Sequence, residues 1–265
     1  MSKHNAEAPI MAIREVSKSY GGVHAVRDVT LDIDSTKITA LIGPNGAGKT
    51  TLFNLISGFG TPYSGTITFG DTDLTGLSPH RVAKAGIVRT FQTPVGFSSM
   101  TVAENVAVAI AGQGLANPWS PFLRWREDKH THVDALDAAR DQLALAGIED
   151  LADTAISDLS PGSAKLVEIT RQLSMGPKML LLDEPAAAMA VDQIKTLSEL
   201  IRGIIADGVG VLVIDHNLGF VLDLADMVHV LEFGAVVASG TPTEIGRNER
   251  VREIYLGGVE ESDAA

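Results

Sequence analysis

Hydrophobic residues in the N-terminal quarter of the chain mostly alternate with polar ones. Ile13–Val16, Val29–Ile33 and Ser64–Phe69 follow this period of two, which is typical of strands with one buried face. Thr39–Ile42 is instead a compact apolar segment that runs directly into glycines, and Lys49–Ile56 then has helical spacing. This part of the chain is therefore predicted to be rich in strands, with one helix directly after a glycine loop.

The pattern changes in the middle of the chain. Val102–Ala111 and Val133–Leu145 are rich in alanine and have helical spacing, so residues from about 97 to 176 are predicted to form a helical subdomain. After it, apolar strands at Met179–Leu182 and Val211–Ile214 alternate with helical segments, a rhythm typical of a parallel sheet. We expect a single domain over 1–265, with its core at about 11–96 and 177–257 and a flexible acidic tail at 258–265.

Composition excludes several classes of protein. The chain has 265 residues, 45% of them hydrophobic, and contains no cysteine, which excludes disulfide frameworks and thiol chemistry. No apolar segment approaches the roughly 18 residues of a spanning helix, and the polar N-terminus lacks the apolar region of a secretory signal. A net charge of −12 argues against nucleic acid as a partner. Any membrane role is expected to come through a partner.

The strongest motif is the segment Gly43–Thr50, GPNGAGKT, which fits G-x-x-x-x-G-K-[ST] between a predicted strand and a predicted helix. Glycines let successive backbone N–H groups point into one concavity, and the following helix adds its unpaired N–H groups and its dipole. Lys49 is expected to reach the β- and γ-phosphates of a nucleotide, and the Thr50 hydroxyl to bind Mg²⁺. The nucleotide-binding residues predicted here are Gly43, Pro44, Asn45, Gly46, Ala47, Gly48, Lys49, Thr50 and Thr51.

A phosphate loop needs a second strand that ends in a carboxylate, and Met179–Glu184 supplies one. Asp183 stands at the carboxyl end of this apolar strand, where open α/β sheets bind ligands, and is predicted to hold Mg²⁺. Glu184 follows directly and is predicted to polarise the attacking water. A glycine turn and two helix-capping carboxylates are the simpler structural interpretation, but the two motifs together favour nucleotide hydrolysis.

Beyond these two motifs, the sequence resembles the ATP-binding subunits of ABC transporters, and most closely the ATPases of branched-chain amino acid importers. The resemblance spans about residues 13–257 and rests on Val16–Gly22, Arg89–Gln92 (RTFQ), Met100–Val106, Leu159–Gly162 (LSPG) and Val211–His216, together with GTPTE at Gly240–Glu244 and EIYLG at Glu253–Gly257. It implies an α/β fold: a RecA-like P-loop NTPase core with an N-terminal antiparallel β subdomain and an inserted α-helical subdomain.

The resemblance also implies roles for individual residues. Tyr20 would stack on adenine, Gln92 would contact Mg²⁺ and the water, and His216 would contact the γ-phosphate and support Glu184. Ser160 and Gly162, ahead of a helix expected at Ala164–Leu173, would bind the γ-phosphate of ATP held by a second ATPase subunit. The implied partners are transmembrane permease subunits, a second ATPase subunit in a homo- or heterodimer, and indirectly a solute-binding protein. The implied location is peripheral, on the cytoplasmic face of the inner membrane.

Two segments depart from the family pattern. The signature loop contains Pro161 where a second small residue is usual, and Ser163 where glutamine is usual. The loop after Glu184 contains Ala188, Ala190 and Val191 in place of glycine, asparagine and proline. Because the chain's own phosphate loop and carboxylates are whole, we hypothesise an asymmetric pair in which this chain offers its partner the weaker signature.

Three functional interpretations stay open at this point. The favoured one is an ATPase that energises uptake of branched-chain amino acids or related amino acids and amides. A second is an ABC ATPase without a membrane partner, and a third is a nucleotide-binding scaffold of low activity within a heterodimer. GTP-binding and adenylate-kinase-like proteins are disfavoured, because they give no reason for Gln92, Ser160–Gly162 and His216 to occur in this order.

Overall fold

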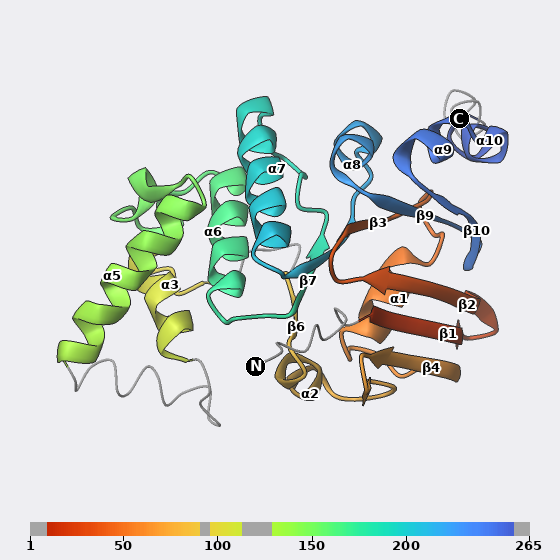
Figure 1. Cartoon of the computed structure of the whole chain (residues 1–265), viewed down its shortest axis with the longest axis horizontal. Helices are drawn as coiled ribbons and strands as arrows, with labels where there is room; N and C mark the ends of the chain where they lie inside the picture. Colours follow the sequence, from red (N-terminus) through yellow and green to blue (C-terminus); the bar gives the residue numbers. More distant parts are fainter. Residues whose placement is uncertain (1–9, 91–95, 113–128, 257–265) are drawn as a thin grey trace, which may run out of the picture.

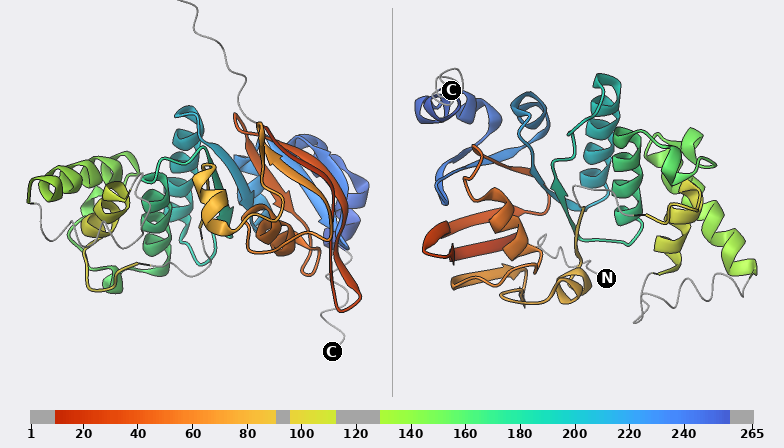
Figure 2. Two further views of the ribbon diagram at one scale, coloured as in Figure 1. Left: turned by 90° about the horizontal axis from the view of Figure 1, so that it is seen from below. Right: turned by 180° about the vertical axis from the view of Figure 1, so that it is seen from behind.

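The computed structural model describes residues 10–90, 96–112 and 129–256, with side chains from 133 onward in the last range except that of Leu256. Gln92, residues 1–9 and the acidic tail 258–265 lie outside these residues. Within them, two sheets occupy one part of the molecule and a group of helices the other (Figure 1). Figure 2 shows α3 and α5 at the end farthest from the antiparallel strands.

The smaller sheet is antiparallel and has the order β2-β1-β4-β5. Its strands are β1 (Ile10–Tyr20), β2 (Val23–Asp34), β4 (Ser64–Phe69) and β5 (Thr72–Asp73). The first two are longer than the sequence pattern indicates, because the register between them shifts between Ile13 and Val16 and again on either side of Lys18. Such irregularities interrupt the strict alternation that predicts a strand.

The larger sheet has the order β10-β9-β3-β8-β7-β6. Its first five strands along the chain are parallel to their neighbours: β3 (Ile38–Ile42), β6 (Ile87–Arg89), β7 (Met179–Asp183), β8 (Gly210–Ile214) and β9 (Met227–Glu232). Only β10 (Ala235–Gly240) is antiparallel, on β9. The predicted α/β fold is confirmed, and Leu41, Ile214 and Asp183 lie at one level across the sheet.

Helices cover both faces of the larger sheet. Helix α1 (Lys49–Ile56) packs between the two sheets, where Phe53 and Leu52 join one hydrophobic cluster with Leu181 and Leu212. The opposite face belongs to a second cluster, in which Leu180 and Leu182 pack with residues of the helical region. Burial on both faces explains why β7 and β8 are continuous apolar runs. The helices on this second side include α7 (Val191–Ala206), α8 (Leu218–Leu224) and α9 (Pro242–Arg247).

The helical region contains α3 (Val102–Ala111), α5 (Lys129–Leu145), α6 (Pro161–Leu173) and two short 3₁₀ turns at Glu149–Leu151 and Ile156–Asp158. Helix α6 begins at Pro161 and not at the expected Ala164, because Ser160 caps the helix and proline suits its first position. Two further helices lie elsewhere, α2 (Pro79–Lys84) and α10 (Glu249–Leu256). None of the helices in the described residues is both long enough and apolar enough to cross a membrane.

Candidate functional site

Three loops meet at one edge of the larger sheet. The phosphate loop follows β3, Glu184 follows β7, and His216 comes two residues after β8. Because β3, β8 and β7 are adjacent and parallel, their carboxyl ends lie together, and the Glu184 N–H donates to Ile214 O at 2.8 Å. The structure therefore brings the phosphate loop, Asp183, Glu184 and His216 to the place where sheets of this type bind ligands.

Two glycines of the phosphate loop have positions that no other residue could occupy without strain. Gly48 has φ +100°, and a Cβ built on it would lie 2.1 Å from Ala25 O in β2. Gly43 has φ +150°, and its Cβ would lie 2.1 Å from Leu231 O in β9. The loop is thus pressed against both sheets, and its glycines are required by close approach as well as by backbone conformation.

Lys49 lies in the first turn of α1 and folds back over the loop. Its Nζ donates to Gly43 O at 2.6 Å and to Pro44 O at 3.0 Å. Burial lowers the pKa of Lys49, and the nearby Glu184 carboxylate opposes that shift. A partly buried ammonium that donates to two carbonyls can exchange them for phosphate oxygens, which are stronger acceptors. Thr50 and Thr51 follow in the same first turn, with their backbone N–H groups at the helix start.

Asp183 ends β7 with its side chain only 3% exposed, and Arg89 holds it. The Nη2 of Arg89 lies 2.7 Å from Asp183 Oδ2, and its Nη1 donates to Asn54 Oδ1 and Ser57 Oγ of α1. Sequence analysis assigned no role to Arg89, because its partners lie 32 to 94 residues away along the chain.

Glu184 and His216 face each other across the ends of β7 and β8. His216 Nδ1 lies 3.8 Å from Glu184 Oε1, and both side chains reach solvent, at 66% and 37% exposure. Glu184 has φ +47°, a conformation that few residues other than glycine adopt. Strained backbone of this kind clusters at functional sites.

A buried carboxylate between these loops fixes their positions. Asp215 is 1% exposed, and its Oδ2 accepts the Ala186 N–H at 3.0 Å while its Oδ1 accepts the Asn217 N–H at 2.8 Å. It thereby joins the loop that carries Glu184 to the loop that carries His216. The sequence analysis gave Asp215 no role, although an aspartate that directly ends an apolar strand was a signal for one.

Tyr20 lies at the end of β1 with half of its surface exposed, and the Lys18 ammonium is 5.2 Å from the ring centre. The β1–β2 hairpin that carries it reaches the phosphate loop through Ala25 and Gly48. On the other side of the loop, burial raises the pKa of Tyr255 in α10 to about 12, although the Gly43 N–H partly opposes this by hydrogen bonding to the phenol oxygen. The C-terminal helix therefore contacts the first residue of the phosphate loop.

The predicted signature residues form their own network. Ser160 Oγ lies 3.0 Å from Ser163 Oγ and accepts the Ser163 N–H, and Gln193 Nε2 lies 3.3 Å from both hydroxyl oxygens. Gly162 is in the first turn of α6, where a Cβ would lie 2.2 Å from Gln193 Oε1. Among the described residues, no hydrogen bond joins Ser160 or Gly162 to Gly43–Thr51 of the same chain.

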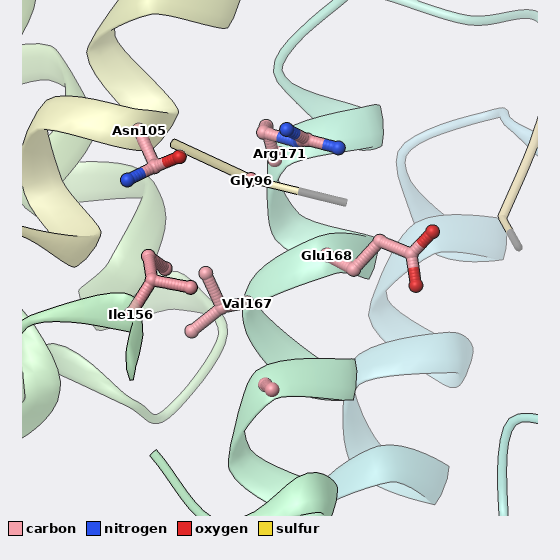
Figure 3. Close-up of a pocket in the computed structure, with 7 residues that line it drawn as sticks. Gly96, Asn105, Ile156, Val167, Glu168 and Arg171 are labelled. Carbon is pink, nitrogen blue, oxygen red and sulfur yellow. The ribbon is translucent and has the colours of Figure 1, made fainter. Parts of the chain in front are cut away.

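The predicted Gln92 lies outside the described residues, which resume at Gly96, and Phe97 is held by α3. Asn105 of α3 is 1% exposed; its amide accepts the Phe97 N–H and donates to the carbonyls of Phe97 and Thr101. Next to it, Gly96, Glu168 and Arg171 line a small pocket between α3 and α6 (Figure 3). Burial lowers the pKa of Arg171, and Glu168 opposes that shift.

Comparison with known proteins identifies the family. A model of ABC transporter cassettes matches residues 26–187, and one of branched-chain amino acid ATP-binding cassette transporters matches residues 235–261. LivG from Salmonella typhimurium, a high-affinity branched-chain amino acid transport ATP-binding protein, is 38% identical over 94% of this chain and 98% of its own. LptB from Acidithiobacillus ferridurans, a lipopolysaccharide export system ATP-binding protein, is 34% identical over 94% of this chain and 97% of its own.

A solved structure agrees with this assignment. The ADP-bound form of MJ1267, an ATP-binding cassette of an ABC transporter, matches with a TM-score of 0.81 and 32% identity, covering 94% of this chain and 99% of its own. The fold is thus that of a known class of ATPase. The chain belongs to the ATP-binding cassette ATPases of ABC transporters.

Proposed function

We propose that this chain is the ATP-hydrolysing subunit of an importer for branched-chain amino acids or related amino acids and amides. The observation that carries the proposal is the meeting of Lys49, Asp183, Glu184 and His216 at one edge of the sheet. The solute class rests on the similarity to LivG and on the match over residues 235–261.

In this proposal the phosphate loop binds the β- and γ-phosphates of ATP. Backbone N–H groups of the loop and of the first turn of α1 donate to the phosphate oxygens, and Lys49 gives up its two carbonyl partners for phosphate oxygens. Tyr20 stacks on the adenine, and about half of the surface of this residue is exposed. Asn45, Pro44 and Ala47 complete the loop.

Thr50 and Asp183 suit Mg²⁺, because a hydroxyl and a carboxylate are the hard oxygen donors that this ion prefers. Asp183 is buried at the strand end, and Thr50 lies in the first turn of α1. When bound, the ion would neutralise charge that develops on the phosphates. Gln92 is proposed as a further ligand, reached from the segment that follows β6.

Glu184 is proposed as the base that orients and deprotonates the attacking water. Its carboxylate is partly exposed, so water can reach it, and His216 lies beside it at 3.8 Å. His216 is proposed to contact the γ-phosphate and to keep Glu184 in position. Asp215 fixes the two loops on which these side chains lie, and so sets their spacing.

We further propose that the chain works with a second ATPase subunit and with transmembrane permease subunits, at the cytoplasmic face of the inner membrane. A solute-binding protein would deliver the solute to the permease. Ser160 and Gly162 would then reach the γ-phosphate of ATP held by the second subunit. In the free chain, however, Ser160 is engaged by Ser163 and Gln193, and Pro161 lacks a backbone donor. This supports an asymmetric pair in which this chain offers the weaker signature.

Reconstitution with the membrane subunits tests the proposal. The complex in vesicles should take up labelled leucine only with ATP, and Glu184→Gln should keep ATP binding but lower turnover by at least about 100-fold, the usual contribution of a general base. Turnover that survives Glu184→Gln would refute the catalytic assignment. Turnover that depends on Glu184 without uptake of any amino acid or amide would refute the assigned solute class.

The similarity to LptB supports one second candidate, a cassette that drives export of a lipid-linked substrate. The two candidates differ in the membrane subunits that copurify with the chain. Isolation from its native membrane with permease subunits and a solute-binding protein favours the importer. Isolation with membrane subunits but without amino acid uptake favours the exporter.

A further inference from the structure

Arg89 occupies a buried position where three structural elements meet. It ends β6, and one guanidinium contacts both the strand β7, through Asp183, and the helix α1, through Asn54 and Ser57. Its side chain is 9% exposed and that of Asp183 is 3% exposed. The bond to Asp183 is 2.7 Å long, and that to Asn54 Oδ1 is 2.6 Å.

Two aromatic rings shield this guanidinium from solvent. Its central carbon lies 5.3 Å from the ring centre of Phe53 and 5.8 Å from that of Phe59. The cation–π contacts hold the guanidinium in place, and low water access strengthens its attraction for the Asp183 carboxylate. A buried ion pair is weak evidence for stability as such, because desolvation offsets most of the attraction. Its fixed geometry is therefore the feature to explain.

The contacts on α1 lie on the helix face that carries Thr50. Asn54 is four residues after Thr50 and Ser57 is seven, and positions with this spacing share one face of a helix. Arg89 therefore lies along the same face as the proposed Mg²⁺ ligand Thr50, while it holds the other proposed ligand, Asp183. It uses only one carboxylate oxygen, and no hydrogen bond within the described residues reaches Asp183 Oδ1.

We propose that Arg89 is a positioning residue for Mg²⁺: it fixes the Asp183 carboxylate relative to Thr50, and so sets the affinity of the site for the ion. This inference rests on the proposed roles of Thr50 and Asp183. A lysine would keep the charge but not the planar fork that reaches Asp183, Asn54 and Ser57 at once. The proposed role therefore requires the planar guanidinium group and not a positive charge alone.

The test is equilibrium binding of ATP to the purified full chain, in EDTA and across a Mg²⁺ titration, for the parent and Arg89→Lys. Partners that orient metal ligands contribute about 10- to 100-fold to metal affinity. We expect Arg89→Lys to raise the Mg²⁺ concentration for half-maximal ATP binding about 10-fold, and to change ATP affinity in EDTA less than about 2-fold. Binding of Mn²⁺ with ATP, followed by electron paramagnetic resonance, should weaken in parallel.

Matched variants separate this role from general destabilisation. Arg14→Lys alters an exposed ion pair with Asp32 and should leave the Mg²⁺ titration unchanged. Asn54→Ala removes one partner of Arg89 and should give a shift of about 3-fold in the same direction, even if Arg89→Lys fails to fold. Equal weakening of ATP binding with and without Mg²⁺ in the variant that folds would overturn the inference.

Asp183→Asn distinguishes this inference from the proposal on which it rests. If Asp183→Asn removes the Mg²⁺ dependence and both Arg89→Lys and Asn54→Ala keep it, the role of Arg89 is wrong and that of Asp183 stands. If Asp183→Asn itself keeps the parent's Mg²⁺ dependence, the proposed ligand is wrong, and the inference about Arg89 falls with it.

Discussion

Asparagine at position 215 would keep the shape of the side chain but remove the charge that joins the Glu184 loop to the His216 loop. The Asp215 carboxylate accepts the N–H groups of Ala186 and Asn217 at 3.0 and 2.8 Å, and it is 1% exposed. Hydrogen bonds to charged groups contribute about 1.5–3 kcal/mol each, against about 1 kcal/mol for neutral ones. These two N–H groups meet different oxygens of the carboxylate, and asparagine keeps only one oxygen there, so its NH₂ group would face the other N–H.

The substitution therefore removes one charge-assisted hydrogen bond and makes the other a neutral one. We estimate that together these changes lower the unfolding free energy by about 3 kcal/mol. For a chain of this size it corresponds to a melting temperature lower by about 6–12 °C. The Glu184 and His216 loops would also relax, and a displacement of about 1 Å can cost about 100-fold in rate. We expect turnover to fall about 10- to 100-fold, with ATP affinity changed less than about 3-fold.

Urea unfolding, steady-state turnover and ATP binding measure these three quantities. Asp207→Asn is the matched control, because Asp207 is exposed after α7 and lies away from both loops. An Asp215→Asn protein whose stability and turnover equal those of the control would refute the reasoning. A fall in ATP affinity as large as the fall in turnover would show that Asp215 supports the whole site and not the spacing of Glu184 and His216.

Three further predictions concern other parts of the chain. Gly48→Ala should abolish ATP binding and lower the unfolding free energy by more than about 2 kcal/mol, because its Cβ would meet Ala25 O. The control is Gly208→Ala, which is also at positive φ but in open space, and which should lower the free energy of urea unfolding by only about 1–2 kcal/mol. Burial lowers the pKa of His229 in the folded chain, so the unfolded chain binds more protons than the folded one as pH falls. The stability that the neutral ring contributes is therefore present above about pH 6.5, and it is lost as pH falls through the lowered pKa of the folded state. His229→Gln should therefore lose less melting temperature than the parent between about pH 7.5 and pH 5.5. Pro161→Gly with Ala190→Asn should raise turnover of the assembled complex at least about 2-fold, and unchanged turnover would refute the asymmetric pair.

The parts of the fold that the sequence could predict are those with an unambiguous burial pattern. Strands β3, β7 and β8 are buried on both faces, and their apolar runs end in chemistry-bearing residues. Helix α9 was missed as a helix, although Thr241, Pro242 and Glu244 form a capping box with proline in the first turn. That signal is in the sequence, but the helix has only six residues and too few turns for a hydrophobic period.

The residues of the candidate site likewise include some that the sequence could assign and some that it could not. Residues in contiguous motifs, such as Lys49 and Glu184, could be named because their spacing along the chain carries the chemistry. Arg89 and Asp215 could not be assigned roles, because their partners are fixed only when separate strands come together. The contact of Gln193 with Ser160 likewise joins residues 33 positions apart. The predicted role of Gln92 stays a prediction.

The alternation of side chains along β7 places neighbouring residues in separate hydrophobic clusters. Leu181 packs with α1 beneath the phosphate loop, whereas Leu182 packs with the helical region on the other face. In β8, Leu212 and Val213 divide in the same manner. Substitutions at odd and even positions of one strand therefore change the packing against different elements. Across the family, positions on the first face should vary together with residues of α1 and the antiparallel sheet, and positions on the second face with residues of the helical region.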